Sequence, residues 1–315
     1  MIIPSPGSFS SIKNCYAVWT AVILNVLIYV MIFGQKQELK KYQIFTGNGI
    51  QLTGQIYLNY LKSNEPQTYL NLPEWLLQID VFNKDQLEIV GSYAIRDSKF
   101  LQQIEQMSAQ GDVVEFKIWK SKMITFMEEF KTENVFTYGL HQGSKNFLSW
   151  MTYQFSHNQF LHLFSNMIFL IFVGCAIEQA VGSFFFILIY LVGGLIGGFF
   201  FLNLGTHGAI PMIGASASIS ALLAFYGVWK LNKRIPFFFF VSPLPQQYGQ
   251  IYLSGWVVFP MILLSDLAQF LTLPEGLGSQ VAHSAHLGGA LSGMIFAFFL
   301  RFLDNILTKT RLLKS

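Results

Sequence analysis

The chain contains few charged residues. Asp, Glu, Lys and Arg make up 12% of its 315 residues, whereas an average soluble domain carries roughly 25%. Hydrophobic residues make up 52%, and 32 residues are Phe. So little charge and so much apolar surface predict a membrane protein. The formal net charge is only +3, so no electrostatic argument points to a nucleic-acid partner.

Cysteine and metal-binding motifs are also scarce. The two cysteines, Cys15 and Cys175, fall at or inside apolar segments, so they provide no disulfide framework. No Cys/His cluster has zinc-finger spacing, and no His-Glu-x-x-His motif occurs, so a zinc protease lacks its signature. No Gly-x-Gly-Asp motif precedes an apolar segment, which leaves a paired-aspartate mechanism without support. We therefore expect no metal and no cofactor.

Six segments are apolar and close to the length of about 20 residues that a helix needs to cross a bilayer. They are 16–34, 157–176, 184–203, 215–229, 251–271 and 283–303. The first is too long for the core of a signal peptide and has no small-residue cleavage site after it, so we expect it to be retained. The sequence therefore predicts an all-α membrane protein built as a bundle of six transmembrane helices.

Lys and Arg are distributed unevenly among the short loops. The loops 204–214 and 272–282 contain none, whereas basic residues precede the first span and follow the fourth and the sixth. They are Lys13, Lys230, Lys233, Arg234, Arg301, Lys309, Arg311 and Lys314. Because cytoplasmic loops are enriched in Lys and Arg, both termini are expected in the cytoplasm. The first residues are not Arg-rich or amphipathic, which favours a bacterial plasma membrane over an organelle.

A polar region separates the first two spans. Asp97 and Asp112 each precede a helical pattern, to about residues 109 and 131, and Asn48-Gly49 and Asn64-Glu-Pro66 are turn signals. Four parts are expected. They are 1–36, the cytoplasmic N-terminus and first span; 37–145, a mostly helical extracytoplasmic loop domain; 146–305, a catalytic core of spans two to six; and 306–315, a basic cytoplasmic tail.

Polar residues inside the spans are costly and usually face the interior of a helix bundle. They are His157, His162 and Asn166 on the second span, Glu178 just past it, Ser216, Ser218 and Ser220 on the fourth, Asp266 on the fifth, and His283 and His286 on the sixth. In the topology above, most of them lie in the outer half of the membrane. A shared depth predicts a functional site, because residues that serve only packing have no reason to share one.

Ser216 is the candidate nucleophile, because it falls in the first turn of the fourth span. Gly214 allows a tight entry into this helix, and the free N–H groups of its first turn can bind a developing oxyanion. His162 and Asn166 are four residues apart and therefore share one helical face. Both can add side-chain donors to the same oxyanion hole.

His286 is the candidate general base. Gly289 and Gly293 form a pair of small residues four apart, which lets the sixth span approach a neighbouring helix closely. If that neighbour is the fourth span, His286 comes within reach of Ser216. A neutral imidazole there can take the serine proton and return it to the leaving amine. The two residues would form a Ser–His dyad.

These residues resemble the rhomboid family of intramembrane serine proteases. The matching motifs are His157-Asn-Gln-Phe-Leu-His162-Leu-Phe-Ser-Asn166, Gly214-Ala-Ser216 and Ala285-His286-Leu-Gly-Gly289-Ala-Leu-Ser-Gly293. The resemblance implies Ser216 as nucleophile and His286 as base. It implies an oxyanion hole from His162, Asn166 and the backbone N–H groups of Ala215 and Ser216. It also implies that the substrates are transmembrane proteins, which enter from the lipid bilayer past the fifth span and the loop 272–282.

The serines and Asp266 allow other assignments. Ser218 lies about 200° around the helix from Ser216 and is expected to pack, whereas Ser220 shares its face and is the rival hydroxyl. Asp266 could hold the imidazole of His286 as the third member of a triad.

His157 and His283 could be purely structural, although together with His162 and His286 they could also bind a metal. No carboxylate partner supports such a site in the sequence. The alternative function is a catalytically silent, rhomboid-like membrane protein for binding or quality control. A transporter is disfavoured, because the polar residues share one depth instead of lining a path across the membrane. The oligomeric state and the identity of the substrate are not predictable.

Overall fold

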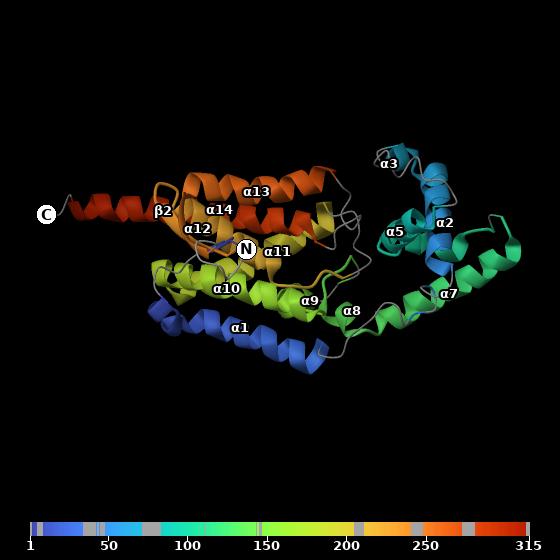
Figure 1. Ribbon diagram of the computed structural model, residues 1–315, viewed down its shortest axis with the longest axis horizontal. Coiled ribbons are helices and arrows are strands. Elements are labelled where there is room, and N and C mark those ends of the chain that lie inside the picture. Colours follow the sequence, from blue (N-terminus) through green and yellow to red (C-terminus); the bar gives the residue numbers. More distant parts are fainter. Residues whose placement is uncertain are drawn as a thin grey trace.

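The computed structural model describes residues 2–4, 9–33, 42, 44, 48–70, 83–109, 111–142, 144, 147–204, 211–240, 248–272 and 281–312. Long helices lie side by side in a bundle, and a smaller group of helices lies beyond one end of it (Figure 1). The predicted all-α class is confirmed, with the addition of a small sheet that the sequence analysis did not predict.

The bundle consists of long apolar helices. They are α1 (Tyr16–Ile28), continued by the π-helical turn η2 (Tyr29–Phe33), α10 (Phe160–Val181), α11 (Ser183–Leu204), α12 (Ser216–Trp229), α13 (Gly255–Thr272) and α14 (His283–Leu312). Among the described residues, three stretches are long and apolar enough to cross a membrane: α10, α11 and residues 283–304 of α14. The helix at 16–32 and α12 are apolar but shorter.

The sheet corrects one predicted span. Strands β1 (Ile2–Pro4), β2 (Arg234–Phe240) and β3 (Tyr248–Ser254) pair antiparallel in that order, with Ile3 opposite Phe238 and Phe237 opposite Ile251. The fifth span was predicted to start at residue 251, but the helix α13 starts at Gly255. Residues 251–254 are apolar enough to resemble a helix in hydropathy, which does not distinguish a strand from a helix.

The sheet also marks one end of the bundle. It lies where α12 ends and α13 begins, far from the smaller group of helices (Figure 1). The amino-terminal strand and the connection from α12 to α13 therefore share this end. The other end carries the starts of α12 and α14 and faces the smaller group.

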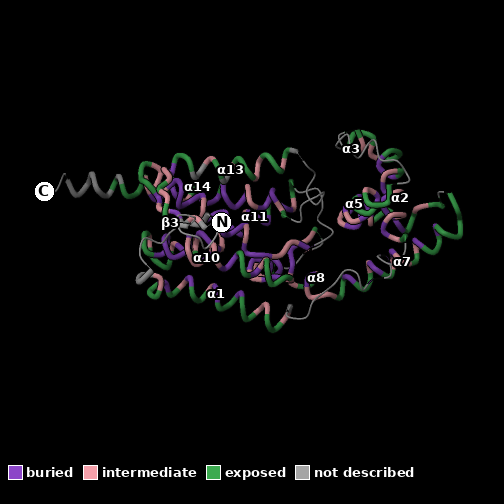
Figure 2. The backbone as a smooth tube through the Cα atoms, in the orientation of Figure 1, coloured by how far each residue is buried: buried purple, intermediate pink, exposed green. Residues whose placement is uncertain are grey.

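Helix α12 lies at the centre of the bundle. Eleven of its 14 residues are buried, and Figure 2 shows buried residues along the inner helices and exposed residues along the outer sides of α1 and α13. Glycines on the neighbouring helices allow this packing. A Cβ on Gly289 of α14 would collide with the carbonyl oxygen of Ala217, and one on Gly293 would collide with that of Ala221. On α11, a Cβ on Gly197 would come within 2.7 Å of the Ala217 Cβ.

The smaller group of helices has a hydrophobic core of its own. It comprises α2 (Gly49–Asn64), α3 (Pro66–Leu70), α5 (Lys84–Ala94), α6 (Ser98–Gln103), η5 (Ile104–Gln106), α7 (Val113–Lys131) and α8 (Asn134–Tyr138). Aromatic residues fill the core, and Tyr57, Phe100 and Trp119 are almost fully buried. Short helices α9 (Phe147–Thr152) and η6 (Tyr153–Phe155) connect this group to α10.

In this group of helices, the predicted helix starts agree with the structure, whereas one predicted helix end and one predicted turn differ from it. Asp97 accepts hydrogen bonds from the backbone N–H groups of Lys99 and Phe100, and Asp112 caps α7 in the same way. The helix after Asp97 ends at Gln103 and continues as a 3-10 turn to Gln106, short of the predicted end at 109. The predicted turn at Asn48 is the start of α2, whose first residue, Gly49, packs against the carbonyl of Ile44.

Candidate active site

The entry into α12 is a tight turn at Gly214. Its backbone φ is +123°, in the region that favours glycine, and its N–H donates to the carbonyl of Tyr153 at 2.9 Å. A Cβ at this position would lie 2.7 Å from Cε1 of His162. Ser216 follows as the first helical residue and is partly exposed. Because Ala215 has no side chain that could cap the helix, the N–H groups of the first turn remain available as donors.

His162 and Asn166 lie against this turn. The His162 ring contacts Gly214, and Nδ2 of Asn166 lies 3.8 Å from the position that a Cβ on Gly214 would take. Two of the predicted oxyanion donors converge on His157, whose Nε2 lies 3.0 Å from Asn166 Nδ2 and accepts from the Ala215 N–H at 3.5 Å. His157 therefore orients both donors through one nitrogen. Its ring also packs edge-on against that of His162.

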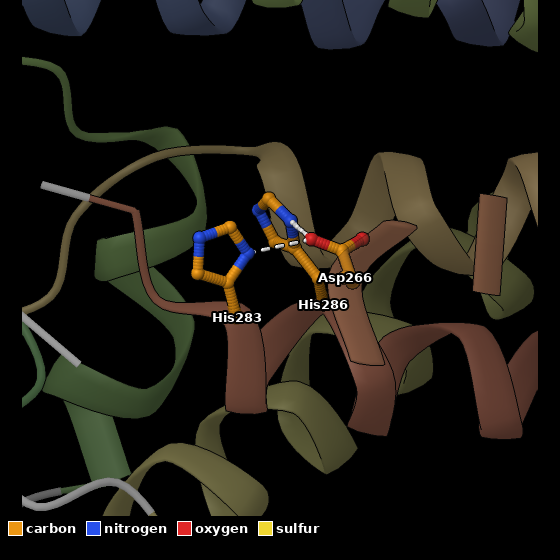
Figure 3. A group of neighbouring side chains, drawn as sticks. All are labelled: Asp266, His283 and His286. Carbon is orange, nitrogen blue, oxygen red and sulfur yellow. Dashed lines mark hydrogen bonds and ion pairs between the residues drawn. The ribbon is translucent and has the colours of Figure 1, made fainter. Parts of the chain in front are cut away.

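Asp266 holds two histidines with a single oxygen. Its Oδ1 lies 2.8 Å from Nδ1 of His283 and 3.0 Å from Nδ1 of His286 (Figure 3). The aspartate comes from α13, and both histidines come from the first turn of α14. A proton on Nδ1 of His286, donated to this carboxylate, leaves Nε2 with a free lone pair. This is the form that a general base requires.

The packing of α14 on α12 brings His286 to the same end of the bundle as Ser216. The two helices start at the same end of the bundle (Figure 1), with Gly289 against Ala217 and Gly293 against Ala221. His286 is three residues before Gly289, or about one turn further toward that end. Ser216 directly precedes Ala217, in the same turn.

The other two serines have different surroundings. Ser218 donates a hydrogen bond to Oε1 of Gln154 at 3.1 Å and is fully buried. Its hydroxyl therefore serves packing in this structure, in the direction expected for a residue on the far side of the helix. Ser220 is 6% exposed and lies one turn deeper than Ser216. Burial makes it a poor match for a nucleophile that must meet water and substrate.

Two supporting residues were not identified in the sequence. Tyr153 accepts from the Gly214 N–H through its carbonyl and donates through its hydroxyl to the carbonyl of Gly194 on α11. Gln154 is fully buried, and its carbonyl accepts from the hydroxyl of Tyr190 at 3.2 Å. A Gln three residues before His157, in the aromatic-rich stretch 150–155, is the sequence signal that could have revealed them.

Glu178 lies at the other end of α10, where its hydrogen bonds are to the starts of α1 and α11. Its two oxygens accept the backbone N–H groups of Ala17 and Val18, each at 3.0 Å, and Oε1 also accepts from the hydroxyl of Ser183 at 2.6 Å. A carboxylate at the start of α1 satisfies free N–H groups and interacts favourably with the helix dipole. Its role is therefore to fix α1 against α10.

The ligand-type side chains of the site form one compact group. Among the described residues, the three whose ligand atoms converge are Asp266, His283 and His286, all within 4.8 Å of one another. The four-histidine arrangement considered from the sequence lacked a carboxylate. Asp266 supplies one, from a helix 17 residues earlier in the chain than His283.

Comparison with known proteins matches the bundle to a family. The Rhomboid domain matches residues 144–302, about half of the chain. The plant protein named RHOMBOID-like protein 12, mitochondrial, from Arabidopsis thaliana is 29% identical over 156 residues. The aligned stretch covers 44% of this chain and 42% of that protein, so the chain spans less than half of its relative's length.

Proposed function

The chain belongs to the rhomboid family and is an integral membrane protein by family and by its apolar helices; from this premise we propose that it is an intramembrane serine protease. The observation that carries the proposal is the meeting of three elements at one end of the bundle. They are the Gly214–Ser216 turn, the His162/Asn166 face of α10 and the start of α14 with His286.

In the proposed reaction, Oγ of Ser216 attacks the carbonyl carbon of a peptide bond. The serine proton moves to Nε2 of His286 as the new C–O bond forms. Asp266 accepts the Nδ1 proton in a hydrogen bond at 3.0 Å and so keeps the imidazole in the correct tautomer, while the developing imidazolium gains a nearby negative charge. Asp266 acts through His286 and is a positioning residue.

The tetrahedral intermediate carries a negative charge on the former carbonyl oxygen. The backbone N–H group of Ser216 and the side chains of His162 and Asn166 supply hydrogen-bond donors for it. The Ala215 N–H, which donates to His157 in the structure, would join them by exchanging that bond for one to the oxyanion. The proton on His286 then passes to the leaving nitrogen, and the C–N bond breaks. Water, activated by the same imidazole, hydrolyses the acyl-enzyme and restores Ser216.

The proposed substrates are membrane proteins cut in or next to a transmembrane helix. A helical segment hides its carbonyls in backbone hydrogen bonds, so the cleaved stretch must first unwind. Segments with Gly or other weak helix formers near the membrane edge should therefore be preferred. Entry past α13 is proposed, because this helix exposes large apolar side chains such as Trp256, Met261 and Leu264 on its outer side.

The finer membrane arrangement is also a proposal. Six spans, with both termini in the cytoplasm, would put Lys13, Lys230 and Arg234 on the cytoplasmic side and the domain 37–145 outside. Strand β1 pairs with β2, so the amino-terminal strand and the connection from α12 to α13 lie at the same end of the bundle, which supports this arrangement. Core boundaries at 146–305, with a basic tail after them, and a bacterial plasma membrane complete the proposal. Tag-accessibility mapping in whole cells tests the topology, and cell fractionation tests the compartment.

Labelling with a fluorescent fluorophosphonate probe tests the chemistry, because such probes react with activated serines. The purified, detergent-solubilised protein is compared with Ser216→Ala, Ser218→Ala, Ser220→Ala and His286→Ala. We expect labelling to fall by about 10³-fold or more in Ser216→Ala and His286→Ala, and to persist in the other two.

The remaining outcomes of this test separate the alternatives. A folded wild type that stays unlabelled, beside an active rhomboid that labels, would favour the catalytically silent membrane protein. Loss of labelling in Ser220→Ala with retention in Ser216→Ala would identify the deeper hydroxyl as the nucleophile.

A further inference from the structure

The cluster of Asp266, His283 and His286 holds more ligand atoms than the proposed reaction uses. Proton transfer requires the carboxylate and His286, whereas His283 has no part in it. Yet Nδ1 of His283 lies closer to Oδ1 of Asp266, at 2.8 Å, than Nδ1 of His286 does, at 3.0 Å. Figure 3 shows both rings turned toward the same oxygen.

We propose that these three side chains form a regulatory site for a divalent transition metal of the Zn²⁺ type, which switches the protease off. Two imidazoles and one carboxylate are a ligand set that zinc prefers. Three protein ligands leave a fourth position open for water. The effect on catalysis rests on the proposed protease function, whereas the metal binding does not.

The observed distances are close to those of a metal site. Zinc lies about 2.0–2.2 Å from nitrogen and oxygen ligands, so two ligands of a tetrahedral site are about 3.4 Å apart. The two N···O distances are 2.8 and 3.0 Å and would have to widen by about half an ångström. Side-chain rotation in α13 and α14 can supply this change, and the three ligand atoms already lie within 4.8 Å of one another.

The surroundings of the cluster also suit reversible binding of a metal ion. The side chains of Asp266 and His286 are 15% and 16% exposed, and that of His283 is 6% exposed. The group is therefore partly open at the protein surface, yet shielded enough to strengthen electrostatic attraction to a cation. His283 and His286 are three residues apart on α14 and so face the same side.

Metal binding would block the base through its tautomer. The metal takes the lone pair of Nδ1 on His286, and the single proton of the neutral ring then resides on Nε2. An Nε2–H group cannot accept the proton of Ser216, so the nucleophile stays protonated. No redox change or covalent step is involved, and removal of the metal by a chelator restores the original tautomer.

Metal binding is tested first without reference to activity. The purified full-length protein is titrated with Co²⁺, whose visible absorption reports tetrahedral nitrogen and oxygen ligation, and with Zn²⁺ in competition. We expect one ion per chain. In His283→Gln, whose amide can still donate to Asp266, the affinity should fall by about tenfold or more. His141→Gln, which alters a histidine in the connection after α8, is the matched control and should leave the affinity unchanged.

Cleavage of a transmembrane model substrate is then measured over the same Zn²⁺ range. Wild type and His141→Gln should be inhibited and recover with chelator, whereas cleavage by His283→Gln, measured relative to its own metal-free rate, should resist inhibition. Absence of stoichiometric binding, or equal affinity in His283→Gln, would overturn the metal site. Binding as expected in a protein that never cleaves would instead overturn the protease proposal alone.

Discussion

The bundle and the smaller group of helices both use glycine for close backbone contact, but they differ in how many large apolar side chains face outward. In the bundle, glycine and alanine lie between α11, α12 and α14, and large apolar side chains such as Ile295, Phe298 and Phe302 face outward. In the smaller group, large aromatic residues fill the interior. Helices in lipid gain nothing from burying apolar area and associate through close backbone contact, whereas helices in water associate by burying that area.

Polar residues differ between the two regions as well. In the smaller group, Asp97 and Asp112 cap helices and thereby stabilise the fold. In the bundle, polar side chains gather at the starts of α12 and α14 and contact one another. Apart from Glu178, which fixes α1 at the other end, the polar side chains that carry the proposed chemistry are gathered at one end of the bundle, whereas these two aspartates of the smaller group stabilise helix ends.

The largest expected effect on the contrast between the two regions comes from replacing Trp119. This residue is 1% exposed, and its Nε1 donates to Oγ1 of Thr53. Trp119→Ala should lower the stability of the smaller group by about 3–5 kcal/mol, while fluorophosphonate labelling of the bundle persists. Circular dichroism and labelling measure the two effects, and Val114→Ala on the exposed face is the control. Loss of labelling together with the smaller group would show that the two regions fold as one unit.

Asp266→Asn sharpens the contrast between polar residues. An amide can hold the rings in place but favours the wrong tautomer of His286, so the turnover rate should fall by about 100-fold, or about 2.7 kcal/mol, with little change in thermal stability. Asp97→Asn should do the reverse and cost stability without reducing turnover. Equal turnover in Asp266→Asn and wild type, with no metal present, would exclude a positioning role for the aspartate.

Gly289→Ala tests the close-packing rule of the bundle. The added methyl group would collide with the carbonyl of Ala217, so α14 must shift away from α12, at a cost of about 2 kcal/mol. Thermal unfolding in detergent should show this loss, and cleavage should fall with it, because His286 moves relative to Ser216. Leu291→Ala, on the exposed side of the same helix, should change stability by less than about 0.5 kcal/mol. Equal stability of both variants would contradict the packing rule.

The smallest expected effect concerns His141 in the connection after α8. Its ring is half-buried against Phe136, and burial lowers its pKa below the usual 6.5. Below pH 6.5, His141 of the unfolded chain binds a proton that it does not bind in the folded chain. The contribution of His141 therefore lowers the free energy of unfolding as the pH drops from 7 to 5, and this contribution does not change above pH 7. His141→Gln should remove this part of the pH dependence, which unfolding titrations measure. An unchanged slope in the variant would assign it to other groups.

Sequence reasoning succeeded where one residue type has one physical meaning. The apolar runs predicted the long helices, Asp97 and Asp112 predicted helix starts, and Gly214 predicted a tight turn. It failed at Ile251, which was assigned to a helix but lies in a strand, because hydropathy does not separate a paired strand from a helix. A contact of Asp266 with His286 was one of the assignments considered from the sequence, but its contact with His283 was not, because it joins two helices and no local spacing predicts which face of α13 carries Asp266.

The shortness of α12 sets a depth for the proposed chemistry. Fourteen residues extend about 21 Å, whereas the hydrocarbon core of a bilayer is about 30 Å thick. If the far end of α12 is level with one surface, Ser216 lies about 9 Å below the other. The peptide bond that is cut would then be selected by its distance from the membrane surface. Lengthening or shortening a substrate helix by one turn should move the cleavage position along its sequence by a similar number of residues.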